Sequence, residues 1–194
     1  MRCGWRAALR KTEMSRTVVV MGVSGCGKTA VAGGVAELLG WQAVDADDLH
    51  SPEAVARMRS GQALSDADRL PWLDRVGAVL AKAAADGQGM LIACSALRRI
   101  YRDRLRAACP DVRFVFLDGD RGLIAARMAE RRNHYMPPSL LDSQLLTLER
   151  PGADEPDVLR LHIDQPLSAL VQQACTTLRT PASAAAESTT EPLP

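Results

Sequence analysis

An eight-residue stretch near the start of the chain has the composition and spacing of a phosphate-binding loop. It reads Gly22-Val23-Ser24-Gly25-Cys26-Gly27-Lys28-Thr29 and fits the pattern G-x-x-x-x-G-K-[ST]. In such a loop, backbone N–H groups and the start of the next helix surround phosphates, the lysine reaches the β- and γ-phosphates, and the hydroxyl ligates Mg²⁺. The residues expected to contact a nucleoside triphosphate are Gly22, Ser24, Gly25, Cys26, Gly27, Lys28, Thr29 and Ala30.

Two carboxylates, Asp45 and Asp47, follow the next apolar segment. Two residues apart on extended backbone, they are expected to lie on the same side of the chain. One could hold Mg²⁺ through water, and the other could accept the proton of an attacking hydroxyl group. A pair of solvated turn residues is the alternative.

A later apolar segment ends in Cys94-Ser95 rather than in an aspartate, which favours a small-molecule kinase over motor proteins or GTP switches.

Two groups of arginines could bind anions. Arg127 and Arg131 are four residues apart, so they share a helix face, and a polar segment with prolines follows them. A mobile lid there could bring basic side chains over the γ-phosphate and exclude water, although a solvated helix face is the alternative. The second group could supply one or two contacts to an anionic substrate, and it comprises Arg98, Arg99, Arg102, Arg104 and Arg106.

The composition excludes several classes of protein. The 194 residues carry a formal net charge of +1, so no general attraction to nucleic acid or to an anionic membrane is expected. No apolar run reaches the roughly 18 residues of a membrane span. The five cysteines are scattered, with no C-x-x-C pair, which argues against a disulfide framework or a structural zinc site. A reducing cytoplasm fits this pattern.

The remaining sequence predicts an α/β domain that would position these groups. Five apolar segments alternate with helical segments, which is typical of a five-stranded parallel sheet with helices on both faces. Ligands of such sheets bind at the carboxyl ends of the strands, where the phosphate loop, the aspartate pair and Ser95 would meet. The expected strands are 17–21, 41–45, 89–94, 113–117 and 159–163, and the expected helices are 29–39, 52–59, 71–85, 96–107, 121–131, 139–148 and 167–178.

The ends of the chain differ from this domain. Residues 1–15 are expected to be a disordered extension, and residues 180–194 lack the apolar side chains needed to offset the entropy of ordering. The kinase domain would therefore cover residues 16–179, with a lid at about residues 131–139. Residues 65–69 are polar and are expected to form a turn.

Several motifs together resemble the gluconate kinases, small phosphate-loop kinases with a nucleoside-monophosphate-kinase-like fold. The resemblance extends from about Arg16 to Leu178, and the phosphate loop is its least selective part. The motifs are M-G-V-S-G-C-G-K-T (21–29), D-A-D-D-L-H (45–50), M-R-S-G-Q-A-L-S-D-A-D-R-L-P-W-L (58–73), C-S-A-L-R-R-I-Y-R-D-R-L-R (94–106), H-Y-M-P-P-S-L-L-D-S-Q (134–144) and I-D-Q-P (163–166). The resemblance implies transfer of the γ-phosphoryl group of ATP to the 6-hydroxyl of D-gluconate, with Mg²⁺, and a homodimer.

The resemblance also implies roles for individual residues. Asp45 would bind Mg²⁺ through water, and Asp47 would orient the 6-hydroxyl and accept its proton. Arg127 and Arg131 would face the ATP phosphates with Lys28. Gluconate would contact Asp47, His50, Asp66, Arg69, Ser95, Arg102 and the lid residue His134, with Arg102 on its carboxylate, and Gln165 and Pro166 would lie near adenine.

Two departures from the family pattern, and structural roles that some candidate residues could have, leave alternatives open. The family's H-P-x-x-N is His50-Ser51-Pro52-Glu53-Ala54, without the asparagine, and its K-G-H is Arg132-Asn133-His134. Trp72 could be a core anchor, Asp66 and Arg69 a helix-cap pair, and His50 a support for its own loop. The alternative functions are a kinase for another sugar acid or a shikimate-like acid, and an inactive nucleotide-binding regulatory protein.

Overall fold

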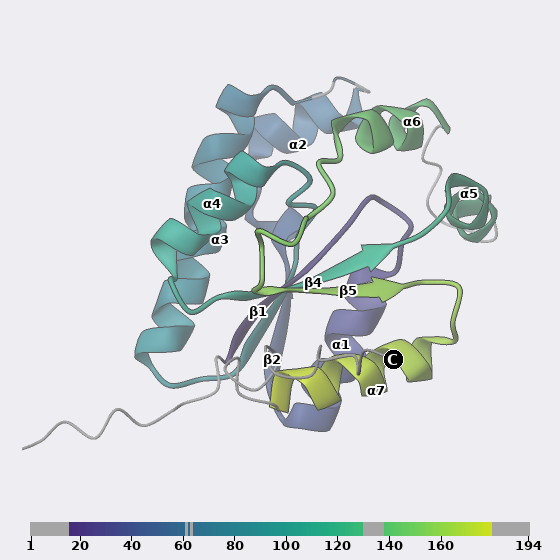
Figure 1. Ribbon diagram of the computed structural model, residues 1–194. Helices are drawn as coiled ribbons and strands as arrows, with labels where there is room; N and C mark the ends of the chain where they lie inside the picture. Colours follow the sequence, from purple (N-terminus) through teal and green to yellow (C-terminus); the bar gives the residue numbers. More distant parts are fainter. Residues whose placement is uncertain (1–15, 61, 63, 130–137, 180–194) are drawn as a thin grey trace, which may run out of the picture.

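A computed structural model describes residues 16–60, 62, 64–129 and 138–179 (Figure 1). The predicted extensions 1–15 and 180–194 lie outside the described residues, as does most of the predicted lid. The described part contains a parallel sheet with the strand order β2-β3-β1-β4-β5, which confirms the predicted α/β class. The strands are β1 (Thr17–Met21), β2 (Gln42–Asp45), β3 (Met90–Ala93), β4 (Arg113–Asp118) and β5 (Val158–His162).

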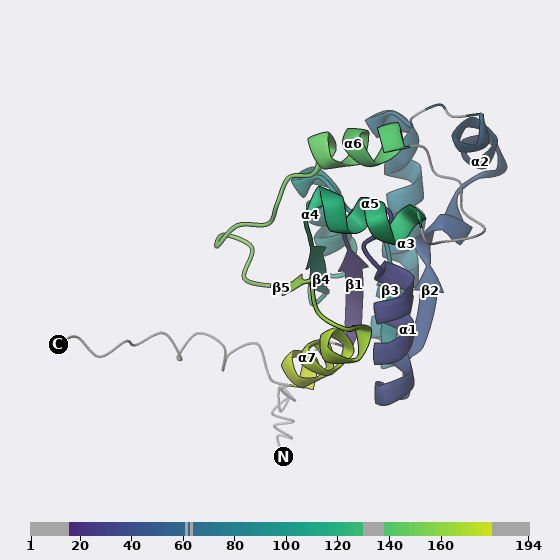
Figure 2. The same cartoon turned by 90° about the vertical axis from the view of Figure 1, so that its right-hand side faces the viewer.

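The sheet has a hydrophobic core on each face. Alternate side chains of a strand point to opposite faces, so Val18 and Val20 of β1 enter one core, and Val19 and Met21 enter the other. Helices α1 (Lys28–Leu39) and α7 (Leu167–Arg179) cover the first face, and α3 (Asp66–Ala85) and α4 (Arg99–Ala108) cover the second (Figures 1 and 2). Central strands buried on both faces explain the continuous apolar runs in the sequence.

Shorter elements lie beyond the carboxyl ends of the strands. The 3₁₀ turn η1 (Ala46–Leu49) and helix α2 (Pro52–Arg59) follow β2, and helices α5 (Arg121–Ala129) and α6 (Pro138–Thr147) follow β4. Figure 2 shows α5 and α6 above the ends of the strands. No helix in the described part of the chain is long and apolar enough to cross a membrane.

Two predicted helix boundaries were wrong for local reasons. Helix α3 includes the predicted turn, because Ser65 accepts a hydrogen bond from the backbone N–H of Asp68 while the Asp68 carboxylate accepts one from the N–H of Ser65. This capping box satisfies N–H groups that would otherwise be orphaned at the helix start. Helix α4 begins three residues later than expected, after Ala96, whose φ of 40° is incompatible with a right-handed helix.

Candidate functional site

The phosphate loop connects β1 to α1 in the predicted strand–loop–helix order. Gly25 and Gly27 have φ angles of 84° and 104°, in the region that favours glycine. A Cβ atom on Gly25 would also lie 2.5 Å from the Met128 side chain of α5. Helix α1 starts at Lys28, so its first N–H groups and the positive end of its dipole belong to the loop. The local backbone is therefore suited to binding phosphates.

Two polar contacts in the loop occur at neighbouring residues. The Lys28 ammonium donates to the carbonyl oxygen of Val23 at 3.0 Å, and the backbone N–H of Ser24 donates to Oε1 of Gln144 at 2.6 Å. Gln144 belongs to α6 and had no predicted role. Its only signal in the sequence was its position at the end of the motif that begins at His134.

Oxygen atoms suited to Mg²⁺ meet where β2 ends beside α1. The Thr29 hydroxyl donates to the Asp45 carboxylate at 2.9 Å, and the same carboxylate accepts the backbone N–H of Asp47 at 3.1 Å. A hydroxyl beside one carboxylate fits an ion that keeps several waters and binds phosphate oxygens. Among the described residues, no group of three or more His, Cys, Asp or Glu side chains could hold a metal.

Asp47 lies in η1 rather than on extended backbone, which corrects the reason given for its closeness to Asp45. Its side chain is 82% exposed, so a substrate can reach it. Partial desolvation is the largest influence on this carboxyl group and raises its pKa, and the charge of Asp45 acts in the same direction. The charges of Lys28 and Arg69 oppose this rise.

His50 and Trp72 form a stacked pair behind η1. Their ring centroids are 4.3 Å apart with an interplanar angle of 10°. The Trp72 indole is buried and donates to the carbonyl oxygen of Ala46 at 2.6 Å, so it anchors η1 as a core residue. The His50 side chain is only 3% exposed, its Nε2 lies 3.9 Å from Asp47, and its Nδ1 has no hydrogen-bond partner in the described structure. Burial, Arg69 and Arg75 lower the pKa of His50 to about 4.

Asp66 and Arg69 do not pair with each other as a helix cap, since Ser65 and Asp68 form that cap. The Asp66 carboxylate instead accepts hydrogen bonds from Tyr101 and Arg98. Arg69 donates through Nε to the carbonyl oxygen of Leu64 at 3.2 Å. No carboxylate among the described residues forms an ion pair with Arg69, although its charge influences both Asp47 and His50.

Arg102 differs from its predicted role as the ligand of the substrate carboxylate. Its side chain is 1% exposed, and two of its nitrogens donate to the buried Glu155 carboxylate at 2.7 and 2.6 Å. A third nitrogen donates to backbone carbonyl oxygens, including that of Glu149 at 3.1 Å. A guanidinium satisfied in this way has no face left for a ligand, so Arg102 is a structural residue.

Arg98, which precedes α4, and Arg99, Arg102, Arg104 and Arg106 within it are called the α4 group here. The members other than Arg102 are also paired with acids. Arg98 binds Asp66 and Glu149, Arg99 binds Asp154, Arg104 binds Asp74, and Arg106 binds Asp103, Glu155 and Asp157. The helix therefore offers no unneutralised arginine to a substrate.

Ser95, another predicted substrate residue, contacts the phosphate loop. Its carbonyl oxygen accepts the backbone N–H of Gly22 at 3.3 Å.

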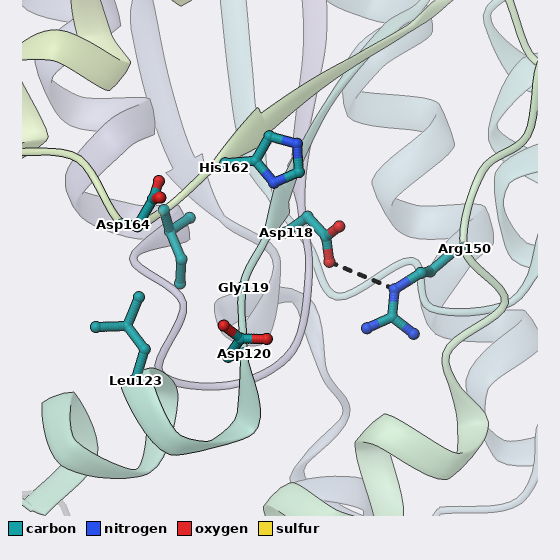
Figure 3. Close-up of a pocket in the computed structure, with 8 residues that line it drawn as sticks. Asp118, Gly119, Asp120, Leu123, Arg150, His162 and Asp164 are labelled. Carbon is teal, nitrogen blue, oxygen red and sulfur yellow. Dashed lines mark hydrogen bonds and ion pairs between the residues drawn. The ribbon is translucent and has the colours of Figure 1, made fainter.

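The other residues predicted to contact the nucleotide lie on α5 and after β5. Arg127 donates to the carbonyl oxygen of Ile163, and Gln165 donates to that of His162 at 3.3 Å, immediately before Pro166 and α7. The segment after β5 borders a pocket of about 220 Å³ that contains the ion pair of Asp118 with Arg150 (Figure 3). Its lining residues are Asp118, Gly119, Asp120, Leu123, Arg150, His162, Ile163 and Asp164. The predicted lid residues Arg131 and His134 lie outside the described residues.

Comparisons with known proteins agree with these observations. A family model described as an AAA domain matches residues 18–151. The chain is 47% identical to a gluconokinase of Gluconobacter oxydans over 161 residues, covering 81% of this chain and 90% of that one. It is 44% identical to the thermosensitive gluconokinase of Escherichia coli, covering 80% and 83%. A solved gluconokinase from Sinorhizobium meliloti matches with a TM-score of 0.80 and 40% identity, covering 91% and 99%. The chain thus belongs to the gluconokinase family of phosphate-loop kinases.

Proposed function

We propose that this protein transfers the γ-phosphoryl group of ATP to the 6-hydroxyl of D-gluconate, giving 6-phosphogluconate and ADP. The observation that carries the proposal is the position of Asp47. It is an exposed carboxylate whose backbone N–H binds Asp45, and Asp45 in turn binds Thr29 of the phosphate loop, in a chain that belongs to the gluconokinase family. A base close to the phosphate loop is what direct transfer to an alcohol requires.

The chemistry assigned to the chain's own residues is a single in-line displacement. Asp47 accepts the proton of the 6-hydroxyl as that oxygen forms a bond to the γ-phosphorus. The bond from phosphorus to the oxygen shared with the β-phosphate breaks, and ADP leaves with the electron pair. Lys28 and the loop N–H groups offset the charge on the phosphates, and Arg127 is proposed to add a further positive charge.

Thr29 and Asp45 are the residues proposed to hold Mg²⁺, directly or through water. The adjacency of their oxygens supports this assignment. The bound ion would supply neutralisation of charge on the β- and γ-phosphates.

Arg69 is proposed to replace Arg102 as the ligand of the gluconate carboxylate. It lies on α3 three residues before Trp72, which anchors η1, and it has no acidic partner among the described residues. A cation without a carboxylate partner can bind an anionic substrate without first breaking an ion pair. His50 is proposed to support η1 through its stack on Trp72 rather than to ionise, because its pKa of about 4 leaves it neutral near pH 7.

A panel of acids tests the identity of the substrate. ADP release with ATP and Mg²⁺ is measured for gluconate, other sugar acids and shikimate. We expect gluconate to give the highest kcat/KM. A higher value for another acid would indicate that Ala54, which replaces the family's asparagine, has changed the specificity. ATP binding without transfer to any acid would support the inactive regulatory alternative.

The homodimer and the cytoplasmic location remain predictions from the family resemblance and the cysteine pattern. The described cysteines, Cys26, Cys94, Cys109 and Cys175, are unbonded and buried. Light scattering of the purified protein measures the oligomeric state, and a mass of one chain would contradict the dimer.

A further inference from the structure

Helix α6 touches the phosphate loop through one side chain. Oε1 of Gln144 accepts the backbone N–H of Ser24 at 2.6 Å, across 120 residues of sequence. Figure 2 shows α6 above the carboxyl ends of the strands, on the side where the loop lies. Gln144 is half-buried, so its position is set by neighbouring atoms as well as by this hydrogen bond.

The contact lies next to the residue of the loop that binds the Lys28 ammonium. Ser24 directly follows Val23, whose carbonyl oxygen binds the Lys28 ammonium. Thr29, which follows Lys28, donates to the Asp45 carboxylate, and that carboxylate also accepts the backbone N–H of Asp47. Gln144 therefore contacts the phosphate loop beside the residue that binds Lys28, and the Asp45–Asp47 segment contacts the same loop at Thr29.

The amide of Gln144 can accept a hydrogen bond from the loop and donate others to a ligand at the same time. An amide group has one oxygen acceptor and an NH₂ group with two donors. The oxygen and nitrogen of an amide are about 2.3 Å apart, which places Nε2 within about 5 Å of the Ser24 nitrogen. Among the described residues, none accepts a hydrogen bond from Nε2. The oxygen is thus held by the loop while the donors remain available.

We propose that Gln144 is a further catalytic residue, whose Oε1 is held by the Ser24 N–H and whose Nε2 donates a hydrogen bond to the γ-phosphoryl group during transfer. This inference rests on the proposed kinase function. A donor fixed in advance does not have to reorganise when charge develops on the phosphoryl oxygens, which is the usual source of such catalysis. Removing one donor of this kind costs on the order of 100- to 1,000-fold in kcat.

Two substitutions separate the donor from the acceptor. Gln144→Glu keeps an oxygen that can accept the Ser24 N–H but removes the NH₂ group and adds a negative charge. Gln144→Ala removes both functions. Ser143→Ala, on the exposed neighbouring residue of α6, is the matched control. For each variant, kcat and KM are measured with the best acceptor, together with the slow transfer of phosphate to water, and the melting temperature is recorded.

The two rates give distinguishable outcomes. We expect kcat and the rate of transfer to water to fall on the order of 100- to 1,000-fold in both Gln144 variants, at least as far in the Glu variant, with the control unchanged. Normal turnover by Gln144→Glu with impaired Gln144→Ala would show that Gln144 only anchors α6, and a change confined to KM for the acceptor would show a substrate contact. Either result overturns the inference. Transfer to water needs no sugar acid, so it tests Gln144 even if gluconate is not the substrate.

Discussion

The arginines of α4 and the arginines around the candidate site have the same charge but different partners. Each arginine of the α4 group binds at least one carboxylate, and Arg102 forms a buried ion pair with Glu155. Arg69 and Arg127 donate only to backbone carbonyl oxygens among the described residues. The comparison indicates that an arginine is available to an anionic ligand only where the fold has not already neutralised it.

The largest expected effect is on stability, from removing the buried charge of the α4 group. Arg102→Met would leave the Glu155 carboxylate without its main partner in the interior. Breaking one side of a buried pair costs about 3–5 kcal/mol of unfolding free energy. Denaturant unfolding measures this loss, and the folded fraction at low temperature should retain its kcat. A variant that folds normally but cannot bind gluconate would restore the original prediction for Arg102.

The next effect concerns the arginine without an acidic partner. Arg69→Met should raise KM for gluconate by on the order of 10- to 100-fold, the value of a charge-assisted hydrogen bond, with less change in stability. Arg69→Lys should recover part of the loss, since it keeps the charge but not the planar geometry. D-glucitol, which has the hydroxyls but no carboxylate, is the control acceptor. An equal loss with glucitol would contradict recognition of the carboxylate.

The region around His50 and the buried Arg102–Glu155 pair should also lose stability over different pH ranges. His50 has a folded pKa of about 4 against an ordinary 6.5, so the unfolded chain takes up a proton first and stability falls as the pH drops from 6.5 towards 4. Hydrogen bonds from Arg102 lower the pKa of Glu155 from 4.5 to about 2, so its contribution is lost from about pH 4.5 down to pH 2.

Unfolding free energies across this pH range check the assignment. His50→Asn should flatten the dependence between pH 6.5 and 4 and leave the steeper loss at lower pH. An unchanged slope above pH 4.5 would mean that another group is responsible.

The smallest effect is expected at an exposed member of the α4 group. Arg104 binds Asp74 with both side chains at least 40% exposed. Pairs of this kind contribute about 0–1 kcal/mol, so Arg104→Met should barely change the unfolding free energy. A loss as large as that of Arg102→Met would remove the distinction between buried and exposed partners.

Local patterns in the sequence predicted the parts of the site that depend on neighbouring residues. The phosphate loop, the strand before it and the helix after it form one continuous segment, and the spacing of the apolar runs was enough to predict the sheet. The partner of Arg102 lies 53 residues away, and Gln144 lies 120 residues from Ser24. Such contacts are set by how the loops cross the ends of the strands, which no local pattern encodes. The capping box of Ser65 and Asp68 was a local signal for the start of α3, but these residues were predicted to form a turn.

The assignment of Asp47 as the base is the claim on which the mechanism depends. Asp47→Asn preserves size and leaves the phosphate loop intact, so kcat with gluconate and the Kd of ATP are measured on the same preparation. We predict that kcat falls by about 10²–10⁴-fold while the Kd of ATP changes little. Full turnover by Asp47→Asn would contradict the account.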